Sequence, residues 1–356
     1  MSDRIFSLKP LDSFGHVAAE EDAILSYFLT TDAVEQISSN QVFLVLGRKG
    51  SGKTALVRHF TEGVAAKNSK SLTLRSYPWN LHAQRIDLGA SDVEAYVSSW
   101  RYFIAVELGS IVINLAGDNS TPPAMALRRF FEENYGATDP ALGDVLRPAK
   151  LQLSRLSFEP AVMGNKLGSI ALERNTALGR ELNALTEVLI RAVVELGRDL
   201  KLPGLILHFD ELDQGLLTLD EDRERMLVGL VLAARSIRNE CRESPVSVNP
   251  VVYLRTDLWE QLQFSDKNKI THGLTLNLEW DSSALKSLIN VRLEAKLGAG
   301  VAWENVATPD LMRGSQPKWD HILARTFLRP RDLIQFLNSA LEQAKKRDDE
   351  PLVFEN

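Results

Sequence analysis

One stretch, residues 42–57, constrains the fold of this chain more than any other. It reads VFLVLGRKGSGKTALV: an apolar run, a glycine-rich loop, and an amphipathic helical pattern from Ala55. The apolar run predicts a buried strand, and the loop follows the pattern G-x-x-x-x-G-K-[ST]. A strand before and a helix after are the context that a phosphate-binding loop needs. The stretch therefore predicts an α/β fold with a phosphate-binding loop at the end of a strand.

The residue types in this loop suit a bound nucleoside triphosphate. Glycines let the backbone curl so that N–H groups point at phosphate oxygens, and the next helix adds its unpaired amides and the positive end of its dipole. We expect Lys53 to act in catalysis by reaching the β- and γ-phosphates, and the Thr54 hydroxyl to ligate Mg²⁺. The residues predicted to bind the nucleotide are Gly47, Arg48, Lys49, Gly50, Ser51, Gly52, Lys53, Thr54 and Ala55.

Composition favours a cytoplasmic enzyme. The chain has 356 residues, of which 44% are apolar and 25% charged, ample for one large α/β domain and a smaller one. With a net charge of −6, contact with nucleic acid or anionic membrane needs a local patch. Cys241 is the only cysteine, which excludes intramolecular disulfides and a cysteine-based zinc site. The first residues lack a signal core and no apolar run is long enough to span a membrane, so we expect no membrane contact.

A second motif lies at residues 205–213, which read LILHFDELD. The apolar residues predict a buried strand, and the acidic pair at its end has the form of a Walker B motif. Asp210 is expected to hold Mg²⁺ opposite Thr54, and Glu211 to polarise the water that attacks the γ-phosphate. We expect His208, within the strand, to be a core histidine with its hydrogen bonds satisfied.

The following strand is expected at Val251–Leu254, entered through a turn at Asn249–Pro250. It ends at Arg255, a candidate catalytic residue that would contact the γ-phosphate, because a guanidinium matches phosphate with fork geometry. The alternative is a surface arginine that caps a loop. The last core strand is predicted at Thr271–Leu278.

Periodicity divides the rest of the chain into helical parts. A helix is predicted over residues 17–38, and apolar stripes predict long helices over residues 93–115, from Pro122 and over residues 182–200. Residues 151–172 favour a β-hairpin. The expected domains are an N-terminal helical lead-in (1–40), an ATPase core (41–78 and 203–280), a mostly helical insertion (79–202) and a C-terminal helical lid (281–356).

The insertion carries a basic stretch over residues 147–180. Its basic residues, which outnumber Glu159 and Glu173, are Arg147, Lys150, Arg155, Lys166, Arg174 and Arg180. Such a stretch suits contact with nucleic acid or a partner. A solvated surface with scattered charges is the other interpretation, and the sequence favours it.

The C-terminal lid is predicted to contain a helix with an apolar stripe at residues 285–293, short helices at Asp310–Arg313 and Trp319–Phe327, and a long final helix. Arg331 falls in the first turn of that helix, just after Pro330, which suits a helix start. A cation there opposes the helix dipole, and a nearby γ-phosphate would compensate for it. We therefore expect Arg331 to be catalytic by sensing the γ-phosphate, with Arg329 as the second candidate and surface placement as the alternative.

These motifs together resemble a known family. The segments GRKGSGKT, HFDELD, RTD and RPRDLIQFLN occur in the order found in the AAA+-related P-loop ATPases, especially their STAND and KAP-like relatives. The resemblance covers residues 41–78 and 203–345. It implies a three-layer P-loop NTPase fold whose parallel sheet has the order 5-1-4-3-2, with ATP and Mg²⁺ at the carboxyl ends of the strands.

The resemblance also implies partners. Such ATPases often complete their site at a subunit interface with a neighbour's arginine, so we expect a homo-oligomer, with Arg235, Arg238 and Arg242 as candidates. Many serve bacterial conflict systems, including anti-phage defence. Since the chain lacks the appended sensor or effector domain of larger STAND proteins, a separate effector protein is expected.

Several other functions are alternatives to an ATP-driven switch or assembly ATPase. A GTPase would carry N-K-x-D, whereas the nearest match, residues 268–271, lacks the Asp. A small-molecule kinase would be more compact. Two alternatives stay open: a DNA-binding or DNA-remodelling ATPase, and a slowly hydrolysing, ATP-gated scaffold. The rate of ATP hydrolysis distinguishes them, because a motor should hydrolyse ATP fast and a switch should not.

Overall fold

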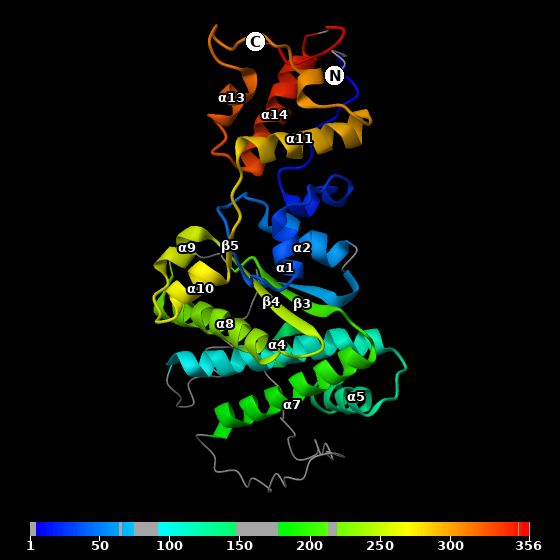
Figure 1. Ribbon diagram of the computed structural model, residues 1–356, viewed down its shortest axis with the longest axis vertical. Coiled ribbons are helices and arrows are strands. Elements are labelled where there is room, and N and C mark those ends of the chain that lie inside the picture. Colours follow the sequence, from blue (N-terminus) through cyan, green and yellow to red (C-terminus); the bar gives the residue numbers. More distant parts are fainter. Residues whose placement is uncertain are drawn as a thin grey trace. The chain divides into compact units, whose positions relative to one another are not determined.

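The chain has an α/β architecture built on one five-stranded, all-parallel sheet, an arrangement consistent with a three-layer α/β fold (Figure 1). The computed structural model describes residues 5–63, 66–74, 92–146, 177–212, 219–347 and 349–355. The strands are β1 (Leu44–Leu46), β2 (Ser69–Thr73), β3 (Gly204–Asp210), β4 (Ser247–Leu254) and β5 (Thr275–Asn277). They lie in the order β2-β3-β4-β1-β5.

β3 is paired in parallel with strands on both sides. Phe209 of β3 lies opposite Leu72 of β2 and Val252 of β4. All residues of β3 from Leu205 on are buried, and so are nearly all of β4. Continuous apolar runs of this kind are typical of parallel strands covered on both faces, which is why the apolar runs of the sequence located β3 and the second half of β4.

The start of β4 corrects the predicted turn at Asn249–Pro250, because both residues lie inside the strand. Proline has no N–H to donate to a neighbouring strand, so it is unusual in a central strand. The side chain of Asn249 supplies donors instead: its amide donates to the carbonyl oxygens of Ile37 at 3.0 Å and Val42 at 3.1 Å. The side chain of Asn249 thus ties this part of β4 to the segment that leads into β1, where the sequence alone favours a turn.

The chain forms two compact units. Unit 1 comprises Met1–Gln36, Leu46–Val64 and Leu276–Asn356, and unit 2 comprises Ile37–Val45 and Ala65–Thr275.

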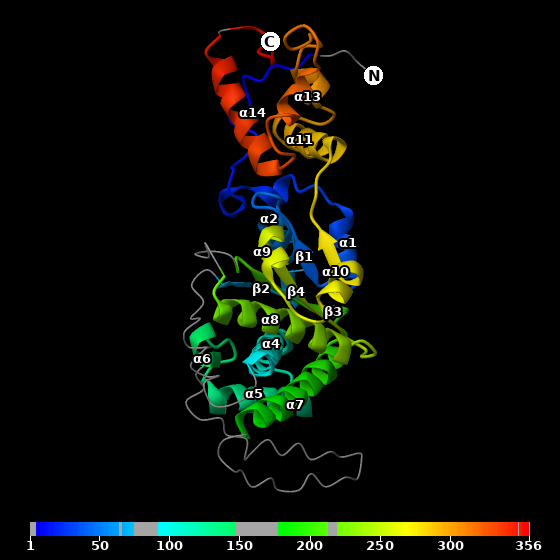
Figure 2. The same ribbon diagram turned by 90° about the vertical axis from the view of Figure 1, so that its left-hand side faces the viewer.

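In unit 2, helices are layered on the sheet (Figures 1 and 2). Helix α8 packs on β4, α4 packs on α8, and α7 runs beside α4. The buried Trp100 of α4 donates its indole N–H to the carbonyl oxygen of Met226 at 3.0 Å, which fixes α4 on α8. The helical elements of this unit are η3 (Ala66–Asn68), α4 (Asp92–Ala116), α5 (Pro122–Asn134), α6 (Leu142–Leu146), α7 (Ala177–Asp199), α8 (Glu221–Glu240), α9 (Thr256–Gln261) and α10 (Lys267–Gly273).

The helices predicted from Val93, from Pro122 and before Pro203 are confirmed as α4, α5 and α7. The predicted last strand was too long, because Thr271 belongs to α10 and β5 begins at Thr275. The hairpin expected over residues 151–172 lies outside the described residues.

In unit 1, helix α2 (Lys53–Glu62) follows the glycine-rich loop and buries Leu56, Val57 and Phe60. The C-terminal helices are α11 (Ser282–Leu297), α12 (Trp303–Val306), α13 (Lys318–Leu323) and α14 (Pro330–Lys345). The stripes predicted on α11 and α14 form one shared core of buried side chains: Leu285, Ile289, Leu293, Leu333, Leu337 and Leu341. Each such side chain contributes roughly 1.5–3 kcal/mol by leaving water. We call these four helices with the segment to residue 355 the C-terminal bundle.

The N-terminal residues complete the core of this bundle. Leu8, Leu11 and Phe14 are fully buried among its side chains. Backbone bonds hold them: Phe6 N–H donates to Asn305 O at 2.8 Å, and Leu8 N–H to Leu352 O at 2.7 Å. The single helix predicted over residues 17–38 was wrong. Two short 3-10 turns, η1 (Ala19–Glu21) and η2 (Ile24–Ser26), precede the helix α1 (Asp32–Ser38).

Two smaller features of the bundle also differ from expectation. Residues 310–313 form no helix, and Met312 instead pairs with Gln316 in an isolated antiparallel bridge. The helix expected at Trp319–Phe327 is α13, which ends at Leu323. Among the described residues, every helix is too short or too polar to cross a membrane.

Candidate functional site

The loop of residues 47–54, called the glycine loop below, joins β1 to α2 in a conformation that requires glycine. Gly50 has φ +85° and Gly52, the N-cap residue of α2, has φ +101°. Side chains with a Cβ rarely adopt this left-handed region. A turn within the loop is closed by the N–H of Ser51, which donates to Arg48 O at 3.1 Å. The glycines of the sequence motif are thus used for backbone curvature at the start of a helix.

Lys53 folds back over the glycine loop. Its ammonium donates to the carbonyl oxygens of Gly47 at 2.8 Å and Arg48 at 3.4 Å. The hydroxyl oxygen of Ser51 is buried and makes no hydrogen bond within the described structure. Since a buried polar atom without a partner is costly, this hydroxyl suits a ligand atom that bonds to it.

The remaining loop residues line the same turn. The side chains of Arg48 and Lys49 are exposed, whereas Thr54 and Ala55, in the first turn of α2, are half-buried. The cations at positions 48, 49 and 53 and the N-terminus of α2 are features that attract an anion. The loop therefore fits a phosphate group on its own residues.

Arg331 lies directly on the glycine loop. Its backbone N–H donates to Gly50 O at 3.3 Å. Within the described ranges, the structure gives its guanidinium no hydrogen bond or ion pair. Arg329, the second candidate, donates from Nη1 to Lys49 O at 3.3 Å and pairs with Asp332 at 2.5 Å. The first turn of α14 is thus seated on the loop, with one arginine ion-paired and the other available for a ligand.

Trp280 is a loop contact that sequence reasoning missed. Its indole N–H donates to Ser51 O at 2.7 Å. Its ring also lies 3.9 Å from the point where a Cβ on Gly52 would sit. The tryptophan precedes α11, so it anchors the glycine loop to the first helix of the C-terminal bundle. No pattern in the sequence pairs residue 280 with residue 51.

In unit 2, Asp210 and Glu211 lie at the carboxyl end of β3, where the sequence placed them. Asp210 is the last residue of the strand, and both Asp210 and Glu211 are buried. Glu211 has φ +58°, an uncommon conformation for a residue with a side chain. Strained backbone of this kind is often found at functional sites.

His208 is a core residue, as expected. Its Nδ1 lies 2.8 Å from the hydroxyl of Tyr253 on β4, and its Nε2 lies 2.9 Å from the hydroxyl of Ser69 on β2. Burial lowers the pKa of His208 from its usual 6.5 to about 3, so the ring is neutral at pH 7. Burial, with the charge of Asp210 adding to it, also raises the pKa of Tyr253 well above its usual value. These neutral groups join three adjacent strands.

Arg255 follows β4 and caps α9. Its guanidinium forms a two-bond pair with Asp257, with Nε to Oδ1 at 3.0 Å and Nη2 to Oδ2 at 2.5 Å. The hydrogen bond from Arg255 lowers the pKa of Asp257. A γ-phosphate role for Arg255 would therefore require it to share its guanidinium with Asp257.

The three arginines considered as contributions to a neighbouring subunit differ in their surroundings. Arg238 is buried and donates to the side chain of Asn40 at 2.9 Å and to Gln41 O at 3.2 Å, so it supports the start of β1. Arg235 pairs with Asp266 at 2.7 Å. Arg242 is exposed at the end of α8. Of the three, Arg238 is buried, Arg235 is half-buried and Arg242 is exposed.

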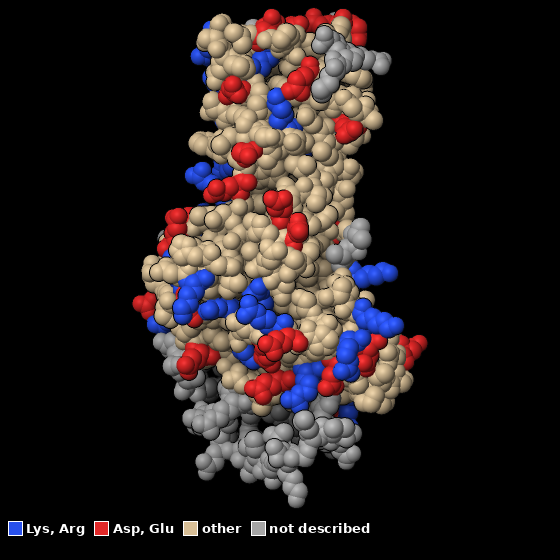
Figure 3. Space-filling model, in the orientation of Figure 1, with Lys and Arg blue, Asp and Glu red and all other residues tan. Residues whose placement is uncertain are grey.

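Charges of both signs mix on the visible face of unit 2 (Figure 3). Arg101 pairs with Glu240 at 2.8 Å, and Arg225 with Glu221 at 3.1 Å. The basic stretch that suggested nucleic-acid contact, residues 147–180, falls outside the described residues except for the backbone of 177–180 at the start of α7. Nucleic-acid binding by that stretch stays a prediction.

Taken unit by unit, the predicted site residues gather in two places. Lys53, Arg329 and Arg331 meet at the glycine loop in unit 1, together with Trp280. Asp210, Glu211 and Arg255 lie at the carboxyl ends of the adjacent parallel strands β3 and β4 in unit 2.

Comparison with known proteins bears on the C-terminal bundle. Residues 283–353 match a family described as the FunZ-associated C-terminal helical domain. No curated protein matches the chain. The matched residues begin within α11 and include Arg331, whereas the glycine loop lies outside them. The chain is thus similar to that family over its C-terminal helices.

Proposed function

We propose that this protein is an Mg²⁺-dependent ATPase in which the glycine loop binds the phosphates of ATP. The observation that carries the proposal is the strand–loop–helix of residues 44–62. Its glycines are left-handed at positions 50 and 52, Lys53 is folded over the loop, and Ser51 Oγ lacks a partner. Anions bind readily where backbone amides and a helix N-terminus converge.

Each predicted residue then has a chemical role. Lys53 would exchange its carbonyl partners for phosphate oxygens, and backbone amides from Gly47 to Ala55 would line the phosphate chain. Thr54 and Asp210 would hold Mg²⁺, which neutralises charge on the β- and γ-phosphates. Glu211 would accept a proton from the attacking water. Arg331, and Arg255 if it shares its pair with Asp257, would stabilise charge on the γ-phosphate.

The sheet supports this proposal. Read from β5, the strand order is 5-1-4-3-2, so the strands that lead to the glycine loop and to Asp210 are separated by β4. In open parallel sheets, ligands bind beyond the carboxyl ends of the strands. Both sequence motifs stand at carboxyl ends, of β1 and β3 respectively.

We further propose that the ATPase acts as a nucleotide-driven switch or assembly protein of the AAA+-related class. The contact of Arg329 and Arg331 with the glycine loop supports this, because a helix seated there can respond to a γ-phosphate. The match of the bundle to a FunZ-associated domain is compatible with a role beside a separate effector in anti-phage defence. Self-association in the presence of ATP, with Arg242 reaching a neighbour, belongs to the same proposal.

Two substitutions test the enzymatic proposal. Lys53→Ala should abolish ATP binding, because the triphosphate loses its principal cation. Glu211→Gln should bind ATP but not hydrolyse it, because an amide cannot accept the proton. Binding is measured by titration with a fluorescent ATP analogue and turnover by phosphate release. Arg129→Ala, which removes an exposed i,i+4 ion pair on α5, is the control. Wild-type hydrolysis by Glu211→Gln would exclude the role of Glu211, and ATP binding unchanged in Lys53→Ala would exclude the loop as the site.

A further inference from the structure

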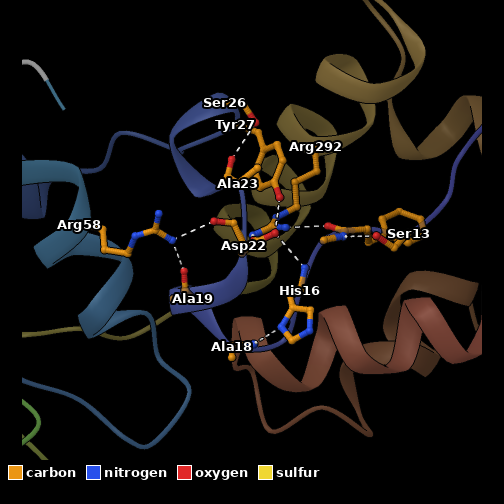
Figure 4. Close-up of polar contacts among 12 residues, drawn as sticks. Ser13, His16, Ala18, Ala19, Asp22, Ala23, Ser26, Tyr27, Arg58 and Arg292 are labelled. Atoms are coloured by element: carbon orange, nitrogen blue, oxygen red, sulfur yellow. Dashed lines mark hydrogen bonds and ion pairs between the residues drawn. The ribbon is translucent and has the colours of Figure 1, made fainter. Parts of the chain in front are cut away.

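A second connection joins α2 to the C-terminal bundle, besides the contacts of Arg329, Arg331 and Trp280 with the glycine loop. It is the segment of residues 13–27, called the N-terminal strap below (Figure 4). The residues just before it, Leu8 and Leu11, are fully buried in the core of the bundle. The strap is therefore anchored at its start in the hydrophobic interior of the bundle.

Polar contacts fix the first part of the strap to two helices of the bundle. The side chain of Asn338 on α14 accepts from the N–H of Phe14 at 2.7 Å and donates to Gly15 O at 2.9 Å. Arg292 on α11 donates to Phe14 O at 2.6 Å. The helix that carries Arg331 is thus bonded to the strap about two turns after Arg331.

The other end of the strap is fixed to α2. Arg58 Nη1 donates to the carbonyl oxygens of Ala19 and Asp22, the latter at 2.8 Å. The same guanidinium is oriented by Glu62, which accepts from Nε at 2.8 Å and from Nη2 at 2.7 Å. Because α2 begins at Lys53, a displacement of Arg58 moves the helix that directly follows the glycine loop.

Asp22 lies between these two ends. In Figure 4, Arg58 approaches it from α2 and Arg292 from α11. Its carboxylate accepts from Arg292 Nη2 at 2.9 Å, from the N–H of His16 at 2.8 Å and from the hydroxyl of Tyr27. The side chains of Asp22 and Arg292 are each only 3% exposed. This is a buried ion pair, with further hydrogen bonds to the carboxylate.

The electrostatics agree with an ionised, firmly held carboxylate. Burial alone would raise the pKa of Asp22, but the bonds from Tyr27 and His16 and the charge of Arg292 outweigh it, so the pKa lies below its usual value. The guanidinium of Arg292 also stacks over Tyr27, 4.4 Å from the ring centre. Both oxygens of the carboxylate accept hydrogen bonds, which favours one geometry at Asp22, whereas Arg292 Nε is buried without a partner within the described residues.

We infer that the N-terminal strap is a tether that couples the C-terminal bundle to α2 and thereby holds Arg331 on the glycine loop. Asp22, Arg58 and Arg292 are its positioning residues. The catalytic meaning of this coupling rests on the proposed function, but the coupling itself is a property of the chain without nucleotide. The two anchors act in series: the bundle holds Phe14 and Asp22, and α2 holds Ala19 and Asp22.

If the strap transmits through both anchors in turn, breaking either one should have the same effect as breaking both, whereas two local stabilising contacts would not behave in this way. Loss of either anchor should loosen the contact between α14 and the glycine loop, and loss of both should loosen it no further. Two independent structural defects would instead add. The measurement is amide hydrogen exchange of nucleotide-free protein, followed in peptides that cover residues 47–54 and 329–334.

Each variant is chosen to fold while it breaks the side-chain contacts on one side of Asp22, and the bonds of Asn338 to the strap stay in place. Arg58→Met removes the anchor on α2 and keeps the length of the side chain. Asp22→Asn/Arg292→Met removes the ion pair without leaving a buried charge unpaired, a change that proteins often tolerate. The matched controls are Arg129→Met, which breaks an i,i+4 pair on α5, and Lys286→Met/Glu304→Gln, which removes an exposed ion pair between α11 and α12.

Arg58→Met and the double variant should each raise exchange in both peptides by roughly three- to tenfold, the range that one or two ordinary hydrogen bonds represent. The variant with all three changes should match the larger of the two, and the controls should match wild type. Unchanged exchange at residues 329–334 in Arg58→Met, or additive effects of the two anchors, would overturn the tether. ATP binding by the wild-type sample is measured separately, so a failure of the proposed function is distinguishable from a failure of the tether.

Discussion

Arg331, in the first turn of α14, lies against Gly50 of the glycine loop. The N–H of Arg331 donates to Gly50 O at 3.3 Å, and a Cβ built on Gly50 would lie 2.8 Å from the Cβ of Arg331. Only glycine permits so close an approach with φ +85°. Position 50 therefore serves two purposes, since it lets the loop curl and lets the C-terminal bundle rest on it.

This contact leads to a prediction for Arg331→Ala. If its guanidinium binds the γ-phosphate, the variant should bind ADP like wild type and lose the tighter binding of ATP by about tenfold or more, since hydrogen bonds to charged groups are worth roughly 1.5–3 kcal/mol. Parallel titrations with ATP and ADP measure the ratio. Arg325→Ala is the control, because the hydrogen bond that the described structure gives the Arg325 side chain goes to His321 O in the preceding helix α13, away from the glycine loop. Equal ATP-to-ADP ratios in Arg331→Ala and wild type would show that Arg331 is a surface residue.

Gly50→Ala should reproduce part of that loss by another route. A methyl group there meets the Cβ of Arg331 at 2.8 Å and its Cδ at 3.1 Å, so α14 must shift away from the glycine loop. The left-handed φ adds a cost of about 1 kcal/mol or more. We expect weaker binding of both nucleotides together with a smaller preference for ATP. Gly143→Ala on α6, where a Cβ meets nothing within 4 Å, is the control. Unaltered nucleotide binding in Gly50→Ala would contradict the close approach.

The fold was predictable wherever local pattern and tertiary environment agree. Apolar runs located β3 and much of β4, and helical stripes located α4, α7, α11 and α14. Residues 42–57 gave the strand, loop and helix together, because their glycine spacing has few structural solutions.

The remainder depends on pairs that are remote in sequence. Asp22 and Arg292 are 270 positions apart, and Trp280 and Ser51 are 229 positions apart. Periodicity within one segment contains no information about such partners. Residues 17–38 read as a helix, yet the carbonyl oxygen of Asp22 accepts from Arg58 on α2 and its carboxylate pairs with Arg292 on α11. The inward-facing role of Leu8, Leu11 and Phe14 was missed for the same reason.

Trp280→Phe tests the contact between the glycine loop and the residue that precedes α11. The change keeps most of the aromatic packing and removes the N–H that donates to Ser51 O. We expect the KM for ATP to rise by roughly threefold to tenfold with little change in kcat, because one neutral hydrogen bond is worth about 0.5–1.5 kcal/mol and it positions the loop before the reaction. Steady-state kinetics provide the measurement. Trp259→Phe on α9, which removes an indole bond to Thr271, is the matched control. A fall in kcat with KM unchanged would contradict a role in positioning the loop.

The buried His208 predicts a pH dependence of stability. Its folded-state pKa is lowered from 6.5 to about 3. Below pH 6.5 the unfolded chain therefore binds a proton that the folded protein does not, and the free energy of unfolding falls with falling pH. The slope from this group approaches about 1.4 kcal/mol per pH unit until pH 3, where the folded form also binds the proton. Denaturant unfolding of wild type and His208→Gln between pH 7 and 4 measures it. In the variant, the free energy of unfolding should depend less steeply on pH, because one titrating group has been removed. Identical slopes in the two proteins would refute the assignment.

The turn before α14 stores strain that substitution should release. Phe327 and Leu328 have φ +48° and +51°, and the N–H of Arg329 closes the turn onto Thr326 O at 3.1 Å. Two left-handed residues in a closed turn are the geometry that Asn-Gly prefers, and each bulky residue there costs roughly 1–2 kcal/mol. Because Phe327 is 72% and Leu328 44% exposed, little buried area would be lost. Phe327→Asn/Leu328→Gly should therefore raise the thermal midpoint of unfolding by about 1–3 °C. Leu311→Gly, at a similarly exposed leucine in the same bundle without a positive φ, should lower it. A lower midpoint in both variants would show that the contacts of Phe327 and Leu328 outweigh the strain of their backbone.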